Sequence, residues 1–242
     1  MKRVSLITAI KDRSESLEAA FRTWTRIRGI SQIIIVDWSS KDSSIVQKVA
    51  KLDRRVLVAR VENEKYFNHT RTKNLGVNLS EGETIIVTDA DIKIDPRLRR
   101  LFPPRWLRNP LSRGDADKAF YRGWIPGGYG TIVVRRKMFD AVGGYDERME
   151  GWGGSDDDLY HRLTLQGFQL RFIPERLLTH IDHPEEARHV NMMVPGRKES
   201  QSRNADLVRL HGLWSKELYA STHKPIVATL WTATGCAGTR AV

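Results

Sequence analysis

The sequence predicts an α/β fold with a mostly parallel central sheet flanked by helices in a single domain. Short β-branched runs, such as those at 4–10 and 32–36, alternate with segments whose apolar residues recur at helical spacing. A chain of 242 residues, 40% of them hydrophobic, is long enough to bury one large core. Strands that alternate with helices form a largely parallel sheet that is covered on both faces.

The first hundred residues carry the regular part of this pattern. Strands are predicted at 4–10, 32–36, 56–61 and 84–88, with helices around 17–24, 45–50 and 71–79 between them. Ligands of such sheets bind in loops beyond the carboxyl ends of the strands. The acidic residues that follow each strand are therefore the first candidates for a site.

The second half is less regular. Three prolines, at 103, 104 and 110, precede a glycine-rich turn at 127–130 and a strand at 131–135. A helix at 156–166 and a last strand at 168–173 follow. Residues 204–219 fit a terminal amphipathic helix, and small residues predict a loosely held tail over the last ~15 positions.

Composition limits the class of partner. The chain has 40 Lys+Arg against 29 Asp+Glu, so its net charge of +11 favours anionic partners such as acidic glycans, anionic lipids or nucleic acid. No nucleic-acid motif accompanies the charge, and no specific nucleic acid is expected. The single cysteine, Cys236, excludes an intramolecular disulfide and fits a reducing compartment. No stretch approaches the ~20 apolar residues of a membrane span. We expect a cytoplasmic protein, with peripheral contact at the inner face of a membrane as an alternative.

Two carboxylates follow the strand at 84–88. Asp89 and Asp91, one residue apart at a strand exit, can share Mn²⁺ or Mg²⁺ with a diphosphate, because hard oxygen ligands suit these ions. The alternative is that both are turn formers. Spacing alone does not separate the two interpretations.

A second acidic group begins a predicted helix. Asp156, Asp157 and Asp158 follow the turn 151–155, Gly-Trp-Gly-Gly-Ser. Acidic residues also stabilise a helix N-terminus, which can explain one or two of them. A carboxylate beside a glycine-rich loop can approach a substrate hydroxyl and act as a general base, and this functional interpretation is preferred.

Other candidates have simpler explanations as well. His180 and His183 follow the last predicted strand and could ligate the same cation, although a lone histidine is more often structural. Asp37 ends the strand at 32–36, where it could cap the next helix or hydrogen-bond a nucleoside.

Together these residues resemble the GT-A glycosyltransferases, in particular the family-2 enzymes and the animal β-1,4-galactosyltransferases. The segment 144–163, GYDERMEGWGGSDDDLYHRL, is similar to the galactosyltransferase segment built on Gly-Trp-Gly-Gly-Glu-Asp-Asp-Asp. The family's segment before the DXD motif is matched by Phe67-Asn68 together with Asn74 and Gly76. The DXD motif itself is matched by residues 89–91, Asp-Ala-Asp. The resemblance implies a Rossmann-like GT-A fold and an enzyme of polysaccharide biosynthesis, with Mn²⁺ or Mg²⁺ as cofactor and a UDP-sugar as donor.

The resemblance also implies roles for residues. Asp156 would be the catalytic base, and Asp91 the direct metal ligand, with Asp89 nearer the ribose and metal shell. His180 would be the third ligand, with His183 the fallback. The nucleotide sugar would lie against Ala9, Lys11, Arg13, Asp37, Phe67, Lys73, Asp89, Ala90 and Trp152. The acceptor would lie near Ser155, Asp157, Tyr129 and Gly128. Residues 1–100 would form the nucleotide-sugar half, 101–200 the acceptor and catalytic half, and 201–242 a helix and tail.

The implied reaction is an inverting single displacement on a glycan or other hydroxyl acceptor, which could be acidic or lipid-linked. Ser155 replaces a family Glu that binds acceptor, and Met149-Glu150 replaces an aromatic acceptor surface, so a different acceptor is expected. Ile125 aligns where a bulky Tyr accompanies galactose transfer and favours an N-acetylhexosamine donor. The family's animal members carry a membrane anchor and disulfides, and their absence here points to a soluble microbial-type enzyme.

Three other functions stay open. A retaining GT-A transferase or a nucleotidyltransferase would keep Asp89 and Asp91 without needing Asp156 as a base. A basic glycan- or nucleic-acid-binding module could keep the fold without turnover, and it would bind DNA in a salt-sensitive way.

Overall fold

The structure is a computed structural model that describes residues 3–102, 118–183, 191–193, 197–210 and 226–242. The proline-rich segment and the predicted helix beyond residue 210 lie outside these ranges. In the first half the elements are β1 (Val4–Ile10), α1 (Ser14–Trp24), β2 (Ile30–Trp38), α2 (Ser44–Leu52), β3 (Val56–Val61), α3 (His69–Leu79), β4 (Thr84–Val87), β5 (Ile92–Ile94) and the 3-10 helix η1 (Pro96–Leu101). In the second half they are β6 (Ala119–Arg122), β7 (Ile132–Arg135), α5 (Arg136–Ala141), α6 (Ser155–Leu165), β8 (Gln169–Phe172), η4 (Glu175–Leu177), β9 (Leu178–His180), α7 (Arg197–Leu210), β10 (Val227–Thr232) and β11 (Gly235–Ala241).

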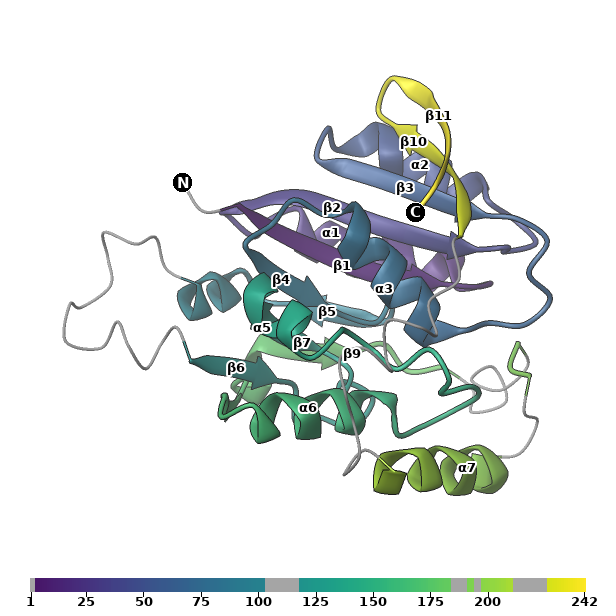
Figure 1. Ribbon diagram of the computed structural model, residues 1–242. Coiled ribbons are helices and arrows are strands. Elements are labelled where there is room, and N and C mark those ends of the chain that lie inside the picture. Colours follow the sequence, from purple (N-terminus) through teal and green to yellow (C-terminus); the bar gives the residue numbers. More distant parts are fainter. Residues whose placement is uncertain (1–2, 103–117, 184–190, 194–196, 211–225) are drawn as a thin grey trace.

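The described residues form a nine-stranded sheet in the order β11-β10-β3-β2-β1-β4-β7-β6-β8 (Figure 1). β3, β2, β1 and β4 are parallel neighbours. β7 and β10 run antiparallel to the strands on either side of them, so all the other strands share one direction. The predicted α/β fold with a mostly parallel sheet is confirmed.

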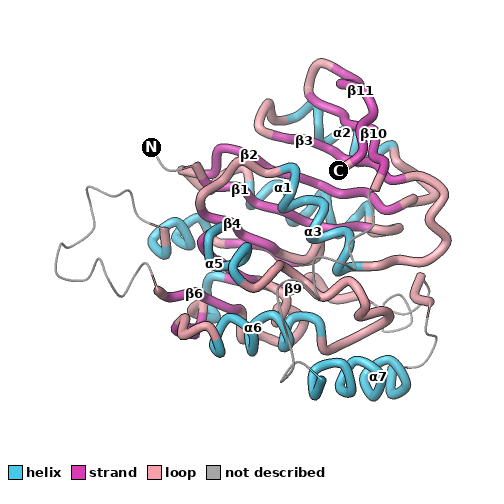
Figure 2. Tube along the Cα trace, in the orientation of Figure 1, coloured by secondary structure: helices cyan, strands magenta, loops and turns pink. Residues whose placement is uncertain are grey.

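Helices cover both faces of this sheet, as the cyan and magenta segments of Figure 2 show. Because side chains alternate along a strand, Leu6 packs into the hydrophobic cluster with α1 and α2, whereas Ile7 packs into the cluster with α3, α5 and α6. The helix predicted from 71 begins two residues earlier, at His69, because the Asn68 side chain caps it by accepting a hydrogen bond from the Arg71 amide at 3.0 Å. Among the described helices, none is long and apolar enough to cross a membrane.

The end of the chain differs from the sequence interpretation. The last residues are not a loose tail: β10 and β11 form an antiparallel hairpin, and β10 pairs with β3 to extend the sheet. Ala228 is buried against the sheet, and the Val242 amide donates to the Ile226 carbonyl at 2.9 Å. The small residues near the end of the chain do not prevent this pairing, because β10 gains backbone hydrogen bonds from the edge of β3.

Candidate active site

A cavity of about 680 Å³ opens at the carboxyl ends of β1 and β4. This is the place predicted for a ligand of a parallel sheet. Most of the residues implied by the resemblance line it: Ala9, Lys11, Arg13, Phe67, Lys73, Asp89, Ala90, Asp91, Tyr129, Trp152, Ser155, Asp156, Asp157 and His180. Residues from both halves of the chain therefore meet across one cavity.

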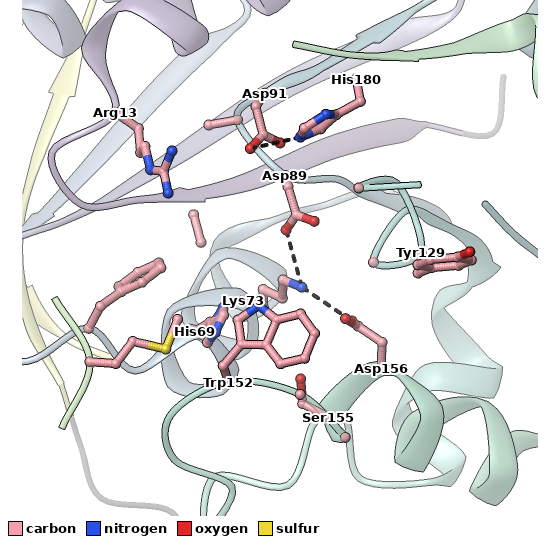
Figure 3. A pocket seen from close by; sticks show the side chains of 18 of the residues that line it. Arg13, His69, Lys73, Asp89, Asp91, Tyr129, Trp152, Ser155, Asp156 and His180 are labelled. Carbon is pink, nitrogen blue, oxygen red and sulfur yellow. Dashed lines mark hydrogen bonds and ion pairs between the residues drawn. The ribbon is translucent and has the colours of Figure 1, made fainter. Parts of the chain in front are cut away.

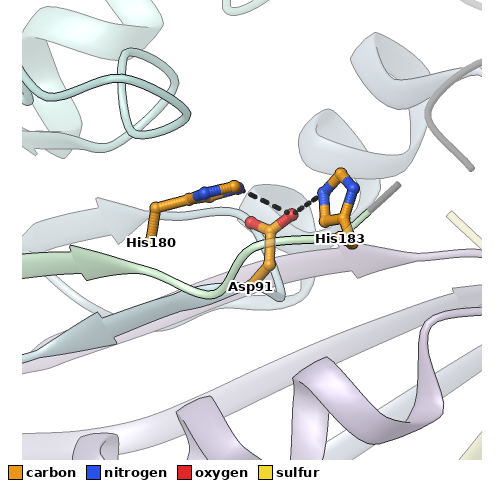
Figure 4. Close-up of side chains that lie close together, drawn as sticks. All are labelled: Asp91, His180 and His183. Atoms are coloured by element: carbon orange, nitrogen blue, oxygen red, sulfur yellow. Dashed lines mark hydrogen bonds and ion pairs between the residues drawn. The ribbon is translucent and has the colours of Figure 1, made fainter. Parts of the chain in front are cut away.

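On one side of the cavity, Asp91 lies between two histidines (Figure 4). Its Oδ2 is 2.9 Å from His183 Nε2 and 3.7 Å from His180 Nε2. β9 pairs antiparallel with β5, which places His180 opposite Ile92, the residue after Asp91. The Ile181 amide also donates to the Asp91 carbonyl at 2.7 Å. This short two-stranded sheet brings to the carboxylate two histidines that lie about ninety positions later in the sequence.

The three side chains fit a divalent cation. One potential ligand atom from each lies within 4.8 Å of the others. The second carboxylate oxygen, Asp91 Oδ1, is buried and has no hydrogen-bond partner in the described part of the chain. Such an orphaned oxygen is costly unless something binds it. A carboxylate with two imidazoles is a donor set suited to Mn²⁺ and related ions.

On the other side, Lys73 lies between two carboxylates (Figure 3). Its ammonium is 3.4 Å from Asp89 Oδ1 and 3.2 Å from Asp156 Oδ1. The lysine side chain is buried, whereas both carboxylates are partly exposed to the cavity. The Lys73 ammonium therefore connects the loop after β4, which carries the DXD motif, to the first turn of α6.

The two aspartates of the DXD motif have opposite electrostatic environments. Burial opposes ionisation of Asp89, but its neighbours together, the Lys73 ammonium first among them, outweigh burial and hold the pKa of Asp89 below its usual value. Burial, reinforced by the charge of Asp89, raises the pKa of Asp91. The carboxylates of Asp156 and Asp89 outweigh burial at Lys73 and raise its pKa. Without a bound cation, Asp91 is thus the less stabilised of the two charges.

Glycines let the backbone approach both sides of the cavity. A Cβ at Gly130 would lie 2.7 Å from Asp89 Oδ2 and 3.1 Å from Asp156 Oδ2. A Cβ at Gly127 would lie 2.4 Å from the His180 ring. The glycine-rich turn 127–130 therefore packs directly against the carboxylates and the histidine, and larger residues would displace them.

The Trp-Gly-Gly turn before α6 is held by α7, which comes fifty residues later. The buried Asn204 side chain donates to the Gly153 carbonyl at 2.6 Å and to the Glu150 carbonyl at 3.2 Å. A Cβ at Gly154, whose φ is +87°, would lie 3.0 Å from Asn204 Cβ. These glycines thus allow α7 to pack closely against the turn that carries Trp152.

Several predicted residues are placed differently. Asp37 is fully buried and does not line the cavity; it pairs with Arg60 and accepts from the Ser40 amide at 3.0 Å. It does not cap the next helix either, because α2 begins only at Ser44, after Ser43 at the N-cap position. Gly128 and Ile125 do not line the cavity either. Lys11 does, but its ammonium donates to three backbone carbonyls at 2.8 to 3.0 Å. We therefore expect Lys11 to hold the loops around β1 together.

The cavity also contains residues that sequence reasoning missed: His69, Arg122, Trp124, Asn191, Met192 and Gln201. His69, at the start of α3, is partly exposed, yet burial, reinforced by the charge of Lys73, lowers its pKa to about 4. Arg122 and Trp124 precede the glycine-rich turn, so position next to that turn was the available signal. The resemblance makes His183 the fallback for His180, whereas the structure brings both histidines to Asp91, in line with the expectation from the residues that both could ligate one cation.

Comparisons with known proteins agree with this geometry. A family model described as the N-terminal domain of galactosyltransferase matches residues 115–190. The probable N-acetylgalactosaminyltransferase 9 of Caenorhabditis elegans is 30% identical over 124 residues, 50% of this chain and 18% of that protein. Chondroitin sulfate synthase 3 of Mus musculus is 28% identical over 111 residues, 44% of this chain and 12% of that protein. The chain thus spans less than a fifth of these two relatives.

Solved structures extend the likeness to the whole fold. The catalytic domain of Drosophila β1,4-galactosyltransferase 7, in complex with xylobiose, superposes with a TM-score of 0.62 at 15% identity, covering 100% of this chain and 93% of that one. GalNAc-T7 with UDP, GalNAc and Mn²⁺ gives a TM-score of 0.66 at 14% identity, covering 88% and 48%. The chain therefore has the GT-A glycosyltransferase fold, and its sequence relatives are glycosyltransferases.

Proposed function

We propose that the protein is a metal-dependent, inverting glycosyltransferase that moves a hexose or N-acetylhexosamine from a UDP-sugar to a hydroxyl group of a glycan acceptor. The observation that carries this proposal is that the Asp91, His180 and His183 group and the Lys73, Asp89 and Asp156 group line one cavity. Polysaccharide biosynthesis is the expected setting.

Asp91, His180 and His183 would hold the cation. A bound Mn²⁺ would offset the negative charge of a diphosphate leaving group. Mn²⁺ appears together with UDP and GalNAc in the GalNAc-T7 structure, and with UDP-Gal and xylobiose in a Drosophila galactosyltransferase 7 mutant. The nucleotide would lie along the wall formed by Ala9, Arg13 and Phe67.

Asp156 would act as the general base. Its carboxylate faces the cavity from the first turn of α6, where the ion pair with Lys73 at 3.2 Å fixes its position. Asp156 accepts the proton of an acceptor hydroxyl while that oxygen bonds to the anomeric carbon. The bond from the anomeric carbon to the diphosphate oxygen breaks, and UDP leaves with the electron pair. Attack opposite the leaving group inverts the anomeric configuration.

The direct test is a panel of UDP-glucose, UDP-galactose, UDP-N-acetylglucosamine and UDP-N-acetylgalactosamine, with released UDP measured in Mn²⁺ and in EDTA. We expect UDP release from at least one donor in Mn²⁺ and none in EDTA. No Mn²⁺-dependent UDP binding or release from any donor would contradict the proposal. The anomeric configuration of the product, measured by NMR, separates inversion from the retaining alternative.

A further inference from the structure

Three large aromatic side chains form an exposed cluster beside the cavity. Trp124 is 50% exposed, Tyr129 44% and Phe172 53%. The Trp124 ring contacts the Tyr129 ring edge-on, with centroids 5.5 Å apart, and the Phe172 ring, with centroids 5.2 Å apart. We call these three residues the aromatic rim. Exposed aromatic rings that contact one another are a candidate interaction surface.

Arg122 and Tyr160 hold the aromatic rim in place. The Arg122 guanidinium lies 5.2 Å from the Trp124 ring centroid and 4.4 Å from that of Tyr160. Tyr160 donates a hydrogen bond to the Tyr129 carbonyl at 2.7 Å. Because Tyr160 belongs to α6, the same helix positions both Asp156 and the rim. The rim therefore has a fixed place relative to the proposed base.

The rim leads out of the cavity. Trp124 and Tyr129 line the cavity, whereas Phe172 does not. Phe172 lies on β8, the last strand of the described sheet, all four residues of which are exposed. An apolar path thus runs from the cavity to the edge strand of the described sheet. Asp157, next to Asp156 and with its side chain 73% exposed, adds a hydrogen-bond acceptor beside this path.

Resting on the proposed function, we infer that the aromatic rim binds a second sugar ring of the acceptor, so that the acceptor is an oligosaccharide rather than a monosaccharide. A pyranose ring presents an apolar face of C–H groups and an edge of hydroxyl groups. Exposed aromatic rings suit the face, and the Asp157 carboxylate suits the hydroxyl groups. A sugar attached to the reacting unit would reach the rim because the rim continues the cavity in which transfer takes place.

The test measures carbohydrate binding without requiring turnover. A glycan array of mono- to tetrasaccharides, probed in the presence of UDP and Mn²⁺, identifies the oligosaccharide that the protein binds best. The affinity of the protein for this oligosaccharide is then compared with its affinity for the same glycan shortened by one sugar. Phe172→Ala removes the outer ring of the rim. Phe172→Tyr retains a ring, and Leu52→Ala is a matched control, because Leu52 is 59% exposed on α2.

We expect the extra sugar to strengthen binding to the wild-type protein about threefold to tenfold. Phe172→Ala should abolish this gain, whereas Phe172→Tyr and Leu52→Ala should keep it. UDP binding in Mn²⁺ should be equal in all four proteins. If UDP does not bind in Mn²⁺, the proposed function fails, and this inference fails with it.

Three results would overturn the inference alone while UDP binding persists. The first is that the extra sugar still strengthens binding in Phe172→Ala. The second is that the wild type binds no oligosaccharide. The third is that Phe172→Ala changes the sedimentation of the protein, which would reveal a self-association surface instead.

Discussion

The two aspartates of the DXD motif are one residue apart, yet they belong to different sides of the cavity. Asp91 faces His180 and His183, and burial raises its pKa. Asp89 faces Lys73, whose ammonium holds the pKa of Asp89 low. On the first side, the buried Asp91 Oδ1 has no hydrogen-bond partner among the described residues, whereas on the second side the Lys73 ammonium neutralises the carboxylates. We therefore expect one short motif to serve two purposes, with Asp91 in the proposed cation site and Asp89 sharing Lys73 with the proposed base.

The largest expected effect lies on the Lys73 side. Asp156→Asn keeps the size of the side chain but removes its ability to accept a proton. We expect the maximal transfer rate to fall about 10² to 10⁴-fold. UDP affinity in Mn²⁺, measured by calorimetry, should stay near that of the wild type. Normal turnover in this variant would remove the assignment of the base.

Asp91→Ala breaks the other side. We expect Mn²⁺-dependent UDP affinity to fall by more than about 100-fold, since the central ligand of the three is lost. The melting temperature of the metal-free protein should not fall, because the raised pKa means that burial disfavours this charge. Asp42→Ala, an exposed aspartate after β2, serves as the control. Equal Mn²⁺ dependence in Asp91→Ala and the control would contradict the metal assignment.

A pH titration sharpens the electrostatic picture of the Lys73 side. His69 has a folded-state pKa of about 4, below its usual 6.5. Between these values the unfolded chain binds a proton that the folded protein does not, so stability is lost as the pH falls from about 6.5 to about 4. We expect a loss of at most about 3 kcal/mol from this group in urea unfolding. His69→Gln should flatten the dependence in this range; an unchanged slope would show that His69 is not its source.

The smallest effects concern the support of the Trp-Gly-Gly turn. Asn204→Ala leaves the Glu150 and Gly153 carbonyls without their donor. We expect a loss of about 1–2 kcal/mol in the free energy of unfolding, together with slower transfer. Arg203→Ala removes only an exposed ion pair with Glu150 and should cost at most about 0.5–1 kcal/mol. Equal losses in the two variants would mean that Asn204 has no special role.

Local pattern was enough to predict the parallel core and the acidic residues. Apolar spacing gave β1, α1 and β3, and the strand exits pointed to Asp89 and Asp91. The contacts of Lys73 with Asp156 and of Asn204 with Gly153 join residues that are more than fifty positions apart in the sequence. Apolar spacing within one segment cannot predict such contacts, because they depend on how distant segments pack. The β10–β11 hairpin was missed because pairing with a distant edge strand, rather than local propensity, determines its structure.

The most direct test of the account is to locate the cation. Crystals grown with Mn²⁺ and UDP, measured at a wavelength where manganese scatters anomalously, should show one strong peak in the cavity. We predict direct ligation by Asp91, His180 and His183, with the UDP diphosphate completing the coordination and Asp156 facing the donor side. A peak elsewhere on the molecule, or UDP bound with no cation at Asp91, would contradict the central claim.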